Sequence, residues 1–299
     1  MKNKISLDTS QYCNDKVFDV IGVSYAGNPQ NNTALFIGKK VEKLVYNLHG
    51  KKDCLVFIDN GIDIPEDIEK SNLIVKCDNP QFEYTLFAKK FESLINDNNR
   101  KRRYLLSDAG YYVGEDVVIG DNCNISRNVF IDHDVIIGNN VIVKEGVKLT
   151  KCIIGDNTII SENVVIGSCA PNVAKFNGIN HLMPILGNVV IGKEVFIGVS
   201  VDIPASMASS TIVGDNSIIA ANSSIGHDDH IGKNVIIASN VSIGGYVEIG
   251  DNVYIGLGAT LKNRICIGNN GYIGMGSVVI RDVDNNAKVF GNPAKRLLK

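Results

Sequence analysis

The sequence contains no tryptophan, only seven prolines and no long apolar run. Its uninterrupted apolar stretches are a few residues long, far short of the roughly 20 residues that span a bilayer, so we expect no membrane span. The first residues, MKNKISLDTSQYCND, lack the apolar core of a secretion signal, which indicates a cytoplasmic protein.

Cysteine occurs seven times, an odd number, and never as a C-x-x-C pair. This pattern fits a reducing compartment and indicates neither a disulfide framework nor a zinc ribbon. The net charge is −2 with acids and bases interspersed, which does not favour a nucleic-acid-binding surface. The one basic cluster, at residues 100–103, is interpreted as part of a solvated linker.

What the sequence does contain is a repeat of six residues. From Val113 to Val279, an aliphatic residue before Gly or another small or polar residue recurs at 25 positions six apart, with one dropped residue and two insertions. A helix would need a period of 3.6 and an amphipathic strand a period of two. Short strands joined by sharp corners give a period of six, with Gly, Asn and Asp suited to the corners.

The repeat predicts a mainly β protein, a left-handed parallel β-helix of about eight coils spaced about 4.8 Å apart. It would occupy residues 105–283 and carry an insertion loop at 168–188. Residues 1–104 lack the repeat, and their β-like runs alternate with helical patterns, which predicts a small α/β domain. Residues 284–299 are predicted to form a turn and a short helix.

Two of the five histidines lie in the stretch SSIGHDDHIGKN, residues 223–234. The repeat places His227 on the outer surface beside a corner, and Asp228 could hold its ring in one tautomer. Such a pair can act as a general base at neutral pH. From the residues alone, the favoured interpretation is that both histidines, His227 and His230, are exposed polar side chains without a catalytic role. A zinc site would need a third convergent imidazole, which His133 and His181 do not supply.

A hexapeptide β-helix with a histidine in one coil resembles the trimeric acyltransferases of that fold. The chain is similar almost from end to end to the UDP-3-O-acyl-glucosamine N-acyltransferases of lipid A synthesis, through ALFIGKKVEKL, NPQFEYTLFAKKFE, MPILGNVVIG and IGHDDHIGKN. The stretch GMGSVVIRDVDNNAKVFGNPAK looks like the acetyl-CoA-dependent sugar acetyltransferases of bacterial glycan synthesis.

The segments expected to recognise the lipid A precursor differ from that family. Of its Phe-x-x-Asn-x-x-Tyr motif only Phe36 remains, with Lys39 and Glu42 at the other positions. Its Gly-Phe-Gly-Tyr is replaced at 170–173, and its Asp-Arg-Gly at 204–206. A kept scaffold with changed recognition segments implies the same chemistry on a different sugar.

The resemblance implies a homotrimer that moves an acetyl or short acyl group from acetyl-CoA or another acyl-CoA to the amine of a nucleotide-linked amino sugar. It implies no bound cofactor and no metal. His227 would be the base and Asp228 its orienting partner, with the oxyanion held by a backbone N–H near Gly244 or Gly245. The other implied contacts are Gly244, Gly245, Gly256, Gly258, Gly276 and Lys295 for the acyl donor, and Phe36, Asn180 and His181 for the sugar nucleotide.

Two other interpretations stay open. One is the lipid A enzyme itself, with an acyl carrier protein as donor, which a long apolar groove for the acyl chain would support. The other is a non-catalytic β-helical scaffold, which predicts a solvent-exposed His227 and no cleft between subunits.

Overall fold

The computed structural model describes residues 5–297, and its contacts divide the chain into two compact units. Unit 1 comprises residues 1–101 and 171–186, and unit 2 comprises residues 102–170 and 187–299. The insertion expected within the β-helical domain is thus grouped, for the most part, with the N-terminal residues. No helix among residues 5–297 has the length and apolar character needed to cross a bilayer.

Unit 1 is built on a four-stranded parallel sheet in the order β3-β4-β5-β6. Side chains alternate between its two faces. Leu35 and Ile37 of β4 join a buried cluster with Val45 of η1 and Ile68 of α1. The predicted runs and helical patterns form β2 (Asp19–Val20), β3 (Gly22–Val23), β4 (Thr33–Ile37), the 3₁₀ helix η1 (Lys39–Leu48), β5 (Leu55–Asp59), β6 (Leu73–Cys77) and α2 (Pro80–Asn99). The structure adds β1 (Leu7–Asp8) and α1 (Glu66–Ser71), which the sequence did not predict.

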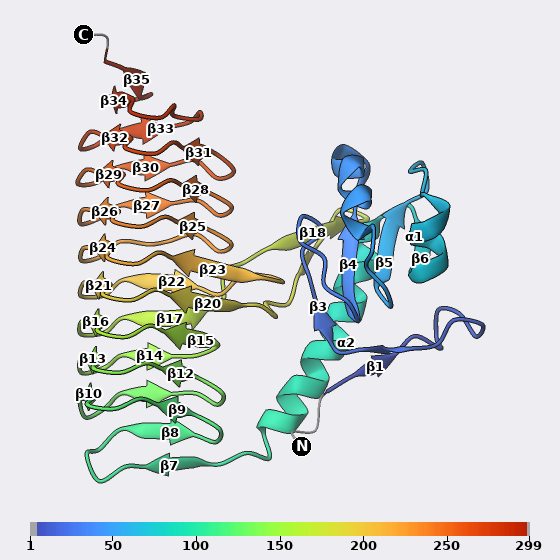
Figure 1. The fold of residues 1–299 in the computed structure, drawn as a ribbon, viewed down its shortest axis with the longest axis horizontal. Helices are drawn as coiled ribbons and strands as arrows, with labels where there is room; N and C mark the ends of the chain where they lie inside the picture. The colour runs from blue at the N-terminus through green and yellow to red at the C-terminus, as the bar shows by residue number, and fades with distance from the viewer. Residues whose placement is uncertain (1–4, 298–299) are drawn as a thin grey trace. The chain divides into compact units, whose positions relative to one another are not determined.

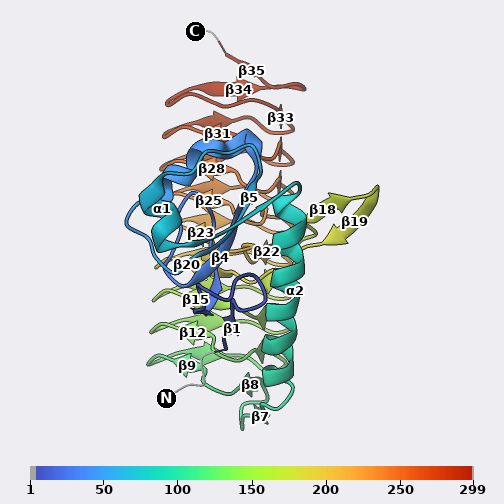
Figure 2. The same ribbon diagram turned by 90° about the vertical axis from the view of Figure 1, so that its right-hand side faces the viewer.

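The predicted insertion loop contains an antiparallel hairpin, β18 (Val173–Phe176) and β19 (Ile179–Leu182). The hairpin lies beside the first turns of α2 (Figure 2). The ring of Phe176 stacks on that of Phe82, with 4.1 Å between centroids and 9° between planes. Asn79 Nδ2 donates to the Lys175 carbonyl at 2.9 Å. These contacts explain why residues 171–186 belong to unit 1.

Unit 2 is a left-handed parallel β-helix whose short strands stack in three sheets (Figure 1). We name the sheets face I, face II and face III in the order in which the chain visits them. Face I holds β7 (Tyr104–Leu106), β8 (Tyr112–Gly114), β11 (Phe130–Ile131), β14 (Lys148–Leu149), β17 (Val165–Ser168), β22 (Asp202–Pro204), β27 (Ser242–Ile243), β30 (Thr260–Leu261) and β33 (Val278–Val279).

The other two faces are built in the same way. Face II holds β9 (Val118–Ile119), β12 (Ile136–Ile137), β15 (Cys152–Ile154), β20 (Asn188–Ile191), β23 (Ser210–Val213), β25 (His230–Ile231), β28 (Glu248–Ile249) and β31 (Cys266–Ile267). Face III holds β10 (Asn124–Ile125), β13 (Ile142–Val143), β16 (Ile159–Ile160), β21 (Phe196–Ile197), β24 (Ile218–Ile219), β26 (Ile236–Ile237), β29 (Tyr254–Ile255), β32 (Tyr272–Ile273), β34 (Lys288–Phe290) and β35 (Lys295–Arg296).

The repeat is packed as the sequence predicts. Its inward aliphatic residues are all buried from Ile131 to Val279. The corners repeatedly place Asn in the left-handed conformation, for example Asn216 (φ 57°), Asn234 (φ 56°) and Asn252 (φ 59°). Asn tolerates this conformation because its short side chain bonds locally. The sequence pattern therefore fixes both the core and the corners.

The C-terminal segment differs from its prediction. Up to residue 297 it forms β34 and β35 and no helix, and β34 adds a level to face III. Val289 of β34 pairs with Ile273 and is buried, as the inward residues of the coils are. Gly291 (φ 97°) and Pro293 follow, and both residue types disfavour helix.

The basic linker also differs from its prediction in part. The Arg102 side chain is only 11% exposed, and its guanidinium lies 2.5 Å from Asp134 and 3.1 Å from Asp116. A second nitrogen donates to the Glu115 carbonyl at 2.8 Å. Because Arg presents several donors in a rigid fork, it ties the start of unit 2 to two coils rather than remaining solvated.

Candidate active site

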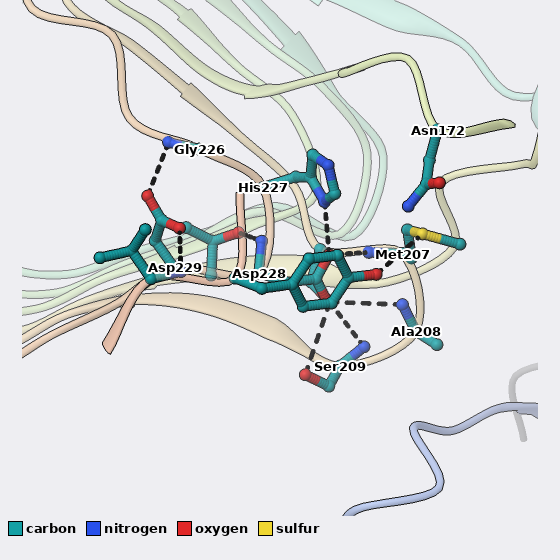
Figure 3. Close-up of polar contacts among 12 residues, drawn as sticks. Asn172, Met207, Ala208, Ser209, Gly226, His227, Asp228 and Asp229 are labelled. Atoms are coloured by element: carbon teal, nitrogen blue, oxygen red, sulfur yellow. Dashed lines mark hydrogen bonds and ion pairs between the residues drawn. The ribbon is translucent and has the colours of Figure 1, made fainter. Parts of the chain in front are cut away.

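His227 and Asp228 lie at one corner of the β-helix, between face I and face II. His227 Nδ1 is 2.8 Å from Asp228 Oδ2, and the two side chains are 15% and 10% exposed (Figure 3). A carboxylate that accepts from Nδ1–H leaves the Nε2 lone pair available. The pair is therefore partly buried and arranged as a base with its orienting acid, unlike the solvent-exposed histidine that the scaffold interpretation predicts.

Asp228 is held by the loop that follows β22. Ser206 Oγ donates to Asp228 Oδ1 at 2.5 Å, and the Met207 N–H donates to Oδ2 at 3.1 Å (Figure 3). Its own N–H donates to Thr211 Oγ1 at 2.9 Å, and its backbone is left-handed, with φ 61°. Hydrogen bonds to both oxygens fix the direction of the carboxylate toward the imidazole.

Gly245 lies one coil beyond His227. A Cβ built on Gly245 would stand 2.8 Å from Nε2 of His227, so the missing side chain makes room for the ring. The Gly244 N–H donates to the Leu261 carbonyl at 3.0 Å and is thus used by the sheet. Among residues 5–297, no acceptor receives the Gly245 N–H. Of the two predicted oxyanion donors, Gly245 is therefore the available one.

The corner of His227 continues over the next two coils with large side chains. Tyr246 (φ 63°) and Arg264 (φ 61°) have the left-handed conformation that Asn has at other corners. The Tyr246 ring meets His227 edge-on, with 5.0 Å between centroids, and the Arg264 guanidinium carbon lies 4.3 Å from the Tyr246 ring centroid. Bulky residues in this conformation are strained, and such strain clusters at functional sites.

Asp229 lies behind the pair, fully buried in the coil. Its carboxylate accepts from the Gly226 N–H at 2.7 Å and from the Val247 N–H at 2.8 Å (Figure 3). Burial raises the pKa of Asp229 to about 7, although these backbone donors act in the opposite direction. The corner therefore holds two adjacent carboxylates in different environments.

The remaining predicted donor-binding glycines do not lie at this corner. Gly258 (φ 66°) and Gly276 (φ 65°) follow face III, at the corner where the chain turns toward face I, and open space surrounds both. Gly256 precedes them in the same turn, where a Cβ would collide with the backbone N of Met275 at 2.6 Å. One chain thus presents the base and these glycines at different corners.

Lys295 lines a cavity of about 270 Å³ at the C-terminal end of the β-helix. Arg281 and Arg296 line the same cavity, together with Asp282 and Asp284. The Arg296 guanidinium lies 3.5 Å from Asp284. Lys295, which the resemblance implies as a contact of the acyl donor, therefore has two further cationic neighbours.

The predicted acceptor-binding residues lie in unit 1, in two places. Phe36 is half-buried on β4, with its ring centroid 5.1 Å from that of Tyr84. His181 on β19 meets the Phe82 ring edge-on, with 4.9 Å between centroids. Asn180 is exposed beside it, opposite Lys175 in the hairpin.

His230 has a separate contact. It lies on face II, where its Nδ1 is 3.2 Å from Glu248 Oε1 on the neighbouring strand β28. Within residues 5–297, no group of three His, Cys, Asp or Glu side chains is arranged to hold a metal ion.

Sequence reasoning missed Ser206, Thr211, Tyr246, Arg264 and Asp229. Two of these break a visible pattern, since Tyr246 and Arg264 replace Asn at 18-residue intervals after Asp228. Asp229 also breaks the pattern, because it is a charged residue at an inward position of the repeat. Nothing in the sequence links the loop residue Ser206 to Asp228.

Comparison with known proteins agrees with the fold. The bacterial transferase hexapeptide model (six repeats) matches residues 116–151 and 230–263, and the hexapeptide repeat of succinyl-transferase matches residues 188–227. Among solved structures, the UDP-N-acetylglucosamine acyltransferase from Campylobacter jejuni is 25% identical, over 64% of this chain and 73% of that chain, with a TM-score of 0.52.

A second solved structure is similar at the level of the fold alone. The UDP-N-acetylglucosamine O-acyltransferase from Moraxella catarrhalis RH4 is 24% identical, over 64% of this chain and 68% of that chain, with a TM-score of 0.41. No curated protein sequence matches the chain.

Proposed function

We propose that this chain, which is similar to hexapeptide-repeat acyltransferases, transfers an acetyl or other short acyl group from CoA to the amine of a nucleotide-linked amino sugar. The observation that carries the proposal is the partly buried pair of His227 and Asp228. A positioned imidazole of this kind can remove the proton of an attacking nucleophile.

In the proposed mechanism, Asp228 holds the proton of His227 on Nδ1 and leaves Nε2 as the base. The acceptor nitrogen attacks the thioester carbonyl carbon, and its proton passes to Nε2. The C–S bond then breaks, and the CoA thiolate leaves with the proton of the imidazolium. The products are an amide and free CoA, and His227 returns to its neutral form.

The Gly245 N–H is the proposed oxyanion donor. Gly245 lies beside the His227 ring, and no acceptor in the described part of the chain receives its N–H. A fixed backbone donor beside the reacting carbonyl is worth several kcal/mol in acyl transfer, about 2.7–4 kcal/mol in a measured case.

We further propose that the working form is a homotrimer. Face III carries a column of outward-facing apolar side chains, and its register aligns Ile159, Phe196, Ile218, Ile236, Tyr254 and Tyr272 on successive strands. Four of them are exposed aliphatic or phenylalanine side chains. A continuous apolar surface favours association, and a second copy could bring the corner of Gly258 and Gly276 to His227.

A second candidate is transfer to a hydroxyl. The solved structure with the TM-score of 0.52 is named for UDP-N-acetylglucosamine, whose amine already carries an acetyl group. A His-Asp pair can deprotonate a hydroxyl as well as an amine. The donor in that case could be an acyl carrier protein.

The test is thiol release from acetyl-CoA with a panel of UDP- and TDP-linked amino sugars. We expect turnover with one amino sugar, and a loss of about 10²- to 10⁴-fold for His227→Ala, because general-base help is worth that much. His230→Ala is the matched control and should retain activity, since His230 pairs with Glu248 on an outer face.

The product separates the candidates, because alkaline hydroxylamine cleaves an oxygen ester and leaves an amide intact. Full turnover by His227→Ala would remove this residue from the mechanism. A hydroxylamine-labile product, or turnover only with an acyl carrier protein, would replace the amine proposal by the second candidate.

A further inference from the structure

Asp229 is a carboxylate in the core of the β-helix. It stands two residues before the inward Ile231, a position where the neighbouring six-residue repeats have Ser217, Ser223 and Val235. Its exposed fraction is 0%. A carboxylate is almost never fully buried without a partner, because the loss of hydration is costly.

One of the two hydrogen bonds of Asp229 is shared with other coils. Its Oδ1 accepts from the Val247 N–H, 18 residues further on. Ser217 makes the equivalent bond, since its Oγ accepts from the Val235 N–H at 3.0 Å. This contact is part of the scaffold and does not require a carboxylate.

The other hydrogen bond is different. In neighbouring coils, the equivalent N–H groups of Gly214 and Ala220 donate to the carbonyls of Ile231 and Ile237 in the next coil, each at 2.8 Å. At Gly226 the N–H donates instead to Asp229 Oδ2 at 2.7 Å. Asp229 thus takes the N–H of Gly226, the residue before His227, out of the hydrogen bonding of the sheet.

The sheet is interrupted at the same level. Face I has a regular strand in the coils on either side, but around Ser224 it has only isolated bridges to Asp202 and Ser242. The turn of residues 226–229, which carries His227 and Asp228, is therefore held from inside the coil by Asp229.

We propose that Asp229 is a positioning residue for the base: its buried carboxylate fixes the turn that carries His227 and supplies a negative charge that favours the imidazolium formed during acyl transfer. This inference rests on the proposed role of His227. The titratable groups that act on Asp229 are His227 and Asp228, both from its own turn.

The charge makes the contribution of Asp229 depend on pH. Burial raises the pKa of Asp229 to about 7, so the carboxylate is protonated below that pH and ionised above it. Only the ionised form stabilises a cation at His227. The benefit of Asp229 to the rate should therefore grow as pH rises through 7.

The experiment compares kcat/KM of the full-length protein and of Asp229→Ser between pH 5.5 and 8.5. Serine keeps the bond to the Val247 N–H, as at Ser217. We expect the wild-type protein to exceed the variant about tenfold or more at pH 8.5, where Asp229 is ionised, and by much less at pH 5.5, where Asp229 is protonated. Asp229→Asn, neutral and of the same size, should follow the serine variant.

Ser217→Ala is the matched control, because it removes a buried polar group at the same repeat position away from His227. It should lower the melting temperature and leave the pH profile unchanged. A ratio between wild type and Asp229→Ser that stays constant with pH would overturn the inference and leave a purely structural role. Absence of wild-type turnover with every acceptor and donor would instead refute the proposed function.

A readout without substrate tests the buried charge itself. The unfolded chain loses the Asp229 proton near its ordinary pKa of 3.8, whereas the folded chain keeps it until about pH 7. The wild-type protein should therefore lose stability relative to Asp229→Asn as pH rises from about 4 to 7, and no further above that. A melting-temperature difference that does not vary with pH would contradict the buried ionisable carboxylate on which the inference depends.

Discussion

Single residues make the corner of His227 unlike the other corners of the same β-helix. At most other corners Asn or Gly takes the left-handed conformation, with exceptions such as Glu194 and Ser200, but at this corner Asp228, Tyr246 and Arg264 take it in three successive coils. The repeat alone does not require these residues, because Asn216 and Asn234 satisfy the same turn. The cost of this conformation is consistent with side chains kept for their chemistry.

Gly245 provides a prediction at this scale. Gly245→Ala would place a methyl group 2.8 Å from Nε2 of His227, and the ring would have to move. We expect kcat to fall by about 10- to 100-fold, because a shift of about 1 Å at a reacting group can cost that much. Steady-state kinetics measures the loss, and circular dichroism should show an unchanged melting temperature. Wild-type kcat in this variant would argue against a reaction at Nε2.

The prediction of His227 and Asp228 depended on the resemblance to acyltransferases of this fold, together with the repeat, which places the two residues beside a corner. The sequence could not predict Ser206, because a loop of irregular structure brings Ser206 to Asp228 from 22 positions away. Sequence spacing carries information only where the backbone is periodic. Loop residues acquire their neighbours from the three-dimensional path of the chain.

At the scale of elements, the periodic parts of the chain were again predictable and the irregular parts were not. The coils follow from the six-residue repeat, and most strands and helices of unit 1 follow from apolar runs and one-sided patterns, whereas the short elements β1 and α1 were not predicted. The hairpin β18–β19 was predicted only as a loop, because its outward residues Ile179 and Leu182 are exposed and give no alternation with a buried face. The prediction of a terminal helix was wrong, because this segment forms β34 and its residue Val289 extends the stack of strands on face III.

The hairpin's contact with α2 gives a prediction for an element. Phe176→Ala removes the ring stacked on Phe82 and should weaken the attachment by about 0.5–1.5 kcal/mol beyond the loss of buried area. We expect faster hydrogen exchange of residues 173–182, measured by mass spectrometry. Leu182→Ala is the control, since Leu182 is exposed and should leave exchange unchanged. Equal exchange in both variants would show that other contacts hold the hairpin.

At the scale of the whole molecule, the faces of unit 2 differ in what they expose. The apolar column of face III runs without a charged residue from Ile159 through Tyr272. Face II changes from Val118 and Ile136 near its start to His230 and Glu248 further along. An uncharged column on a flat sheet is the surface on which an association of copies would bury the most apolar area.

Ile218→Glu tests this association, because it places a charge in the middle of the column on face III, where burial would leave that charge unpaired. Light scattering should give a mass of three times 32.4 kDa for the wild-type protein and a lower mass for the variant. Lys148→Glu, an exposed change on face I, is the control and should keep the wild-type mass.

Since Gly258 and Gly276 lie at a different corner from His227, the dissociated variant should also lose activity while its melting transition persists. A variant that remains trimeric would place the interface elsewhere, and an active monomer would mean that one chain contains the complete site.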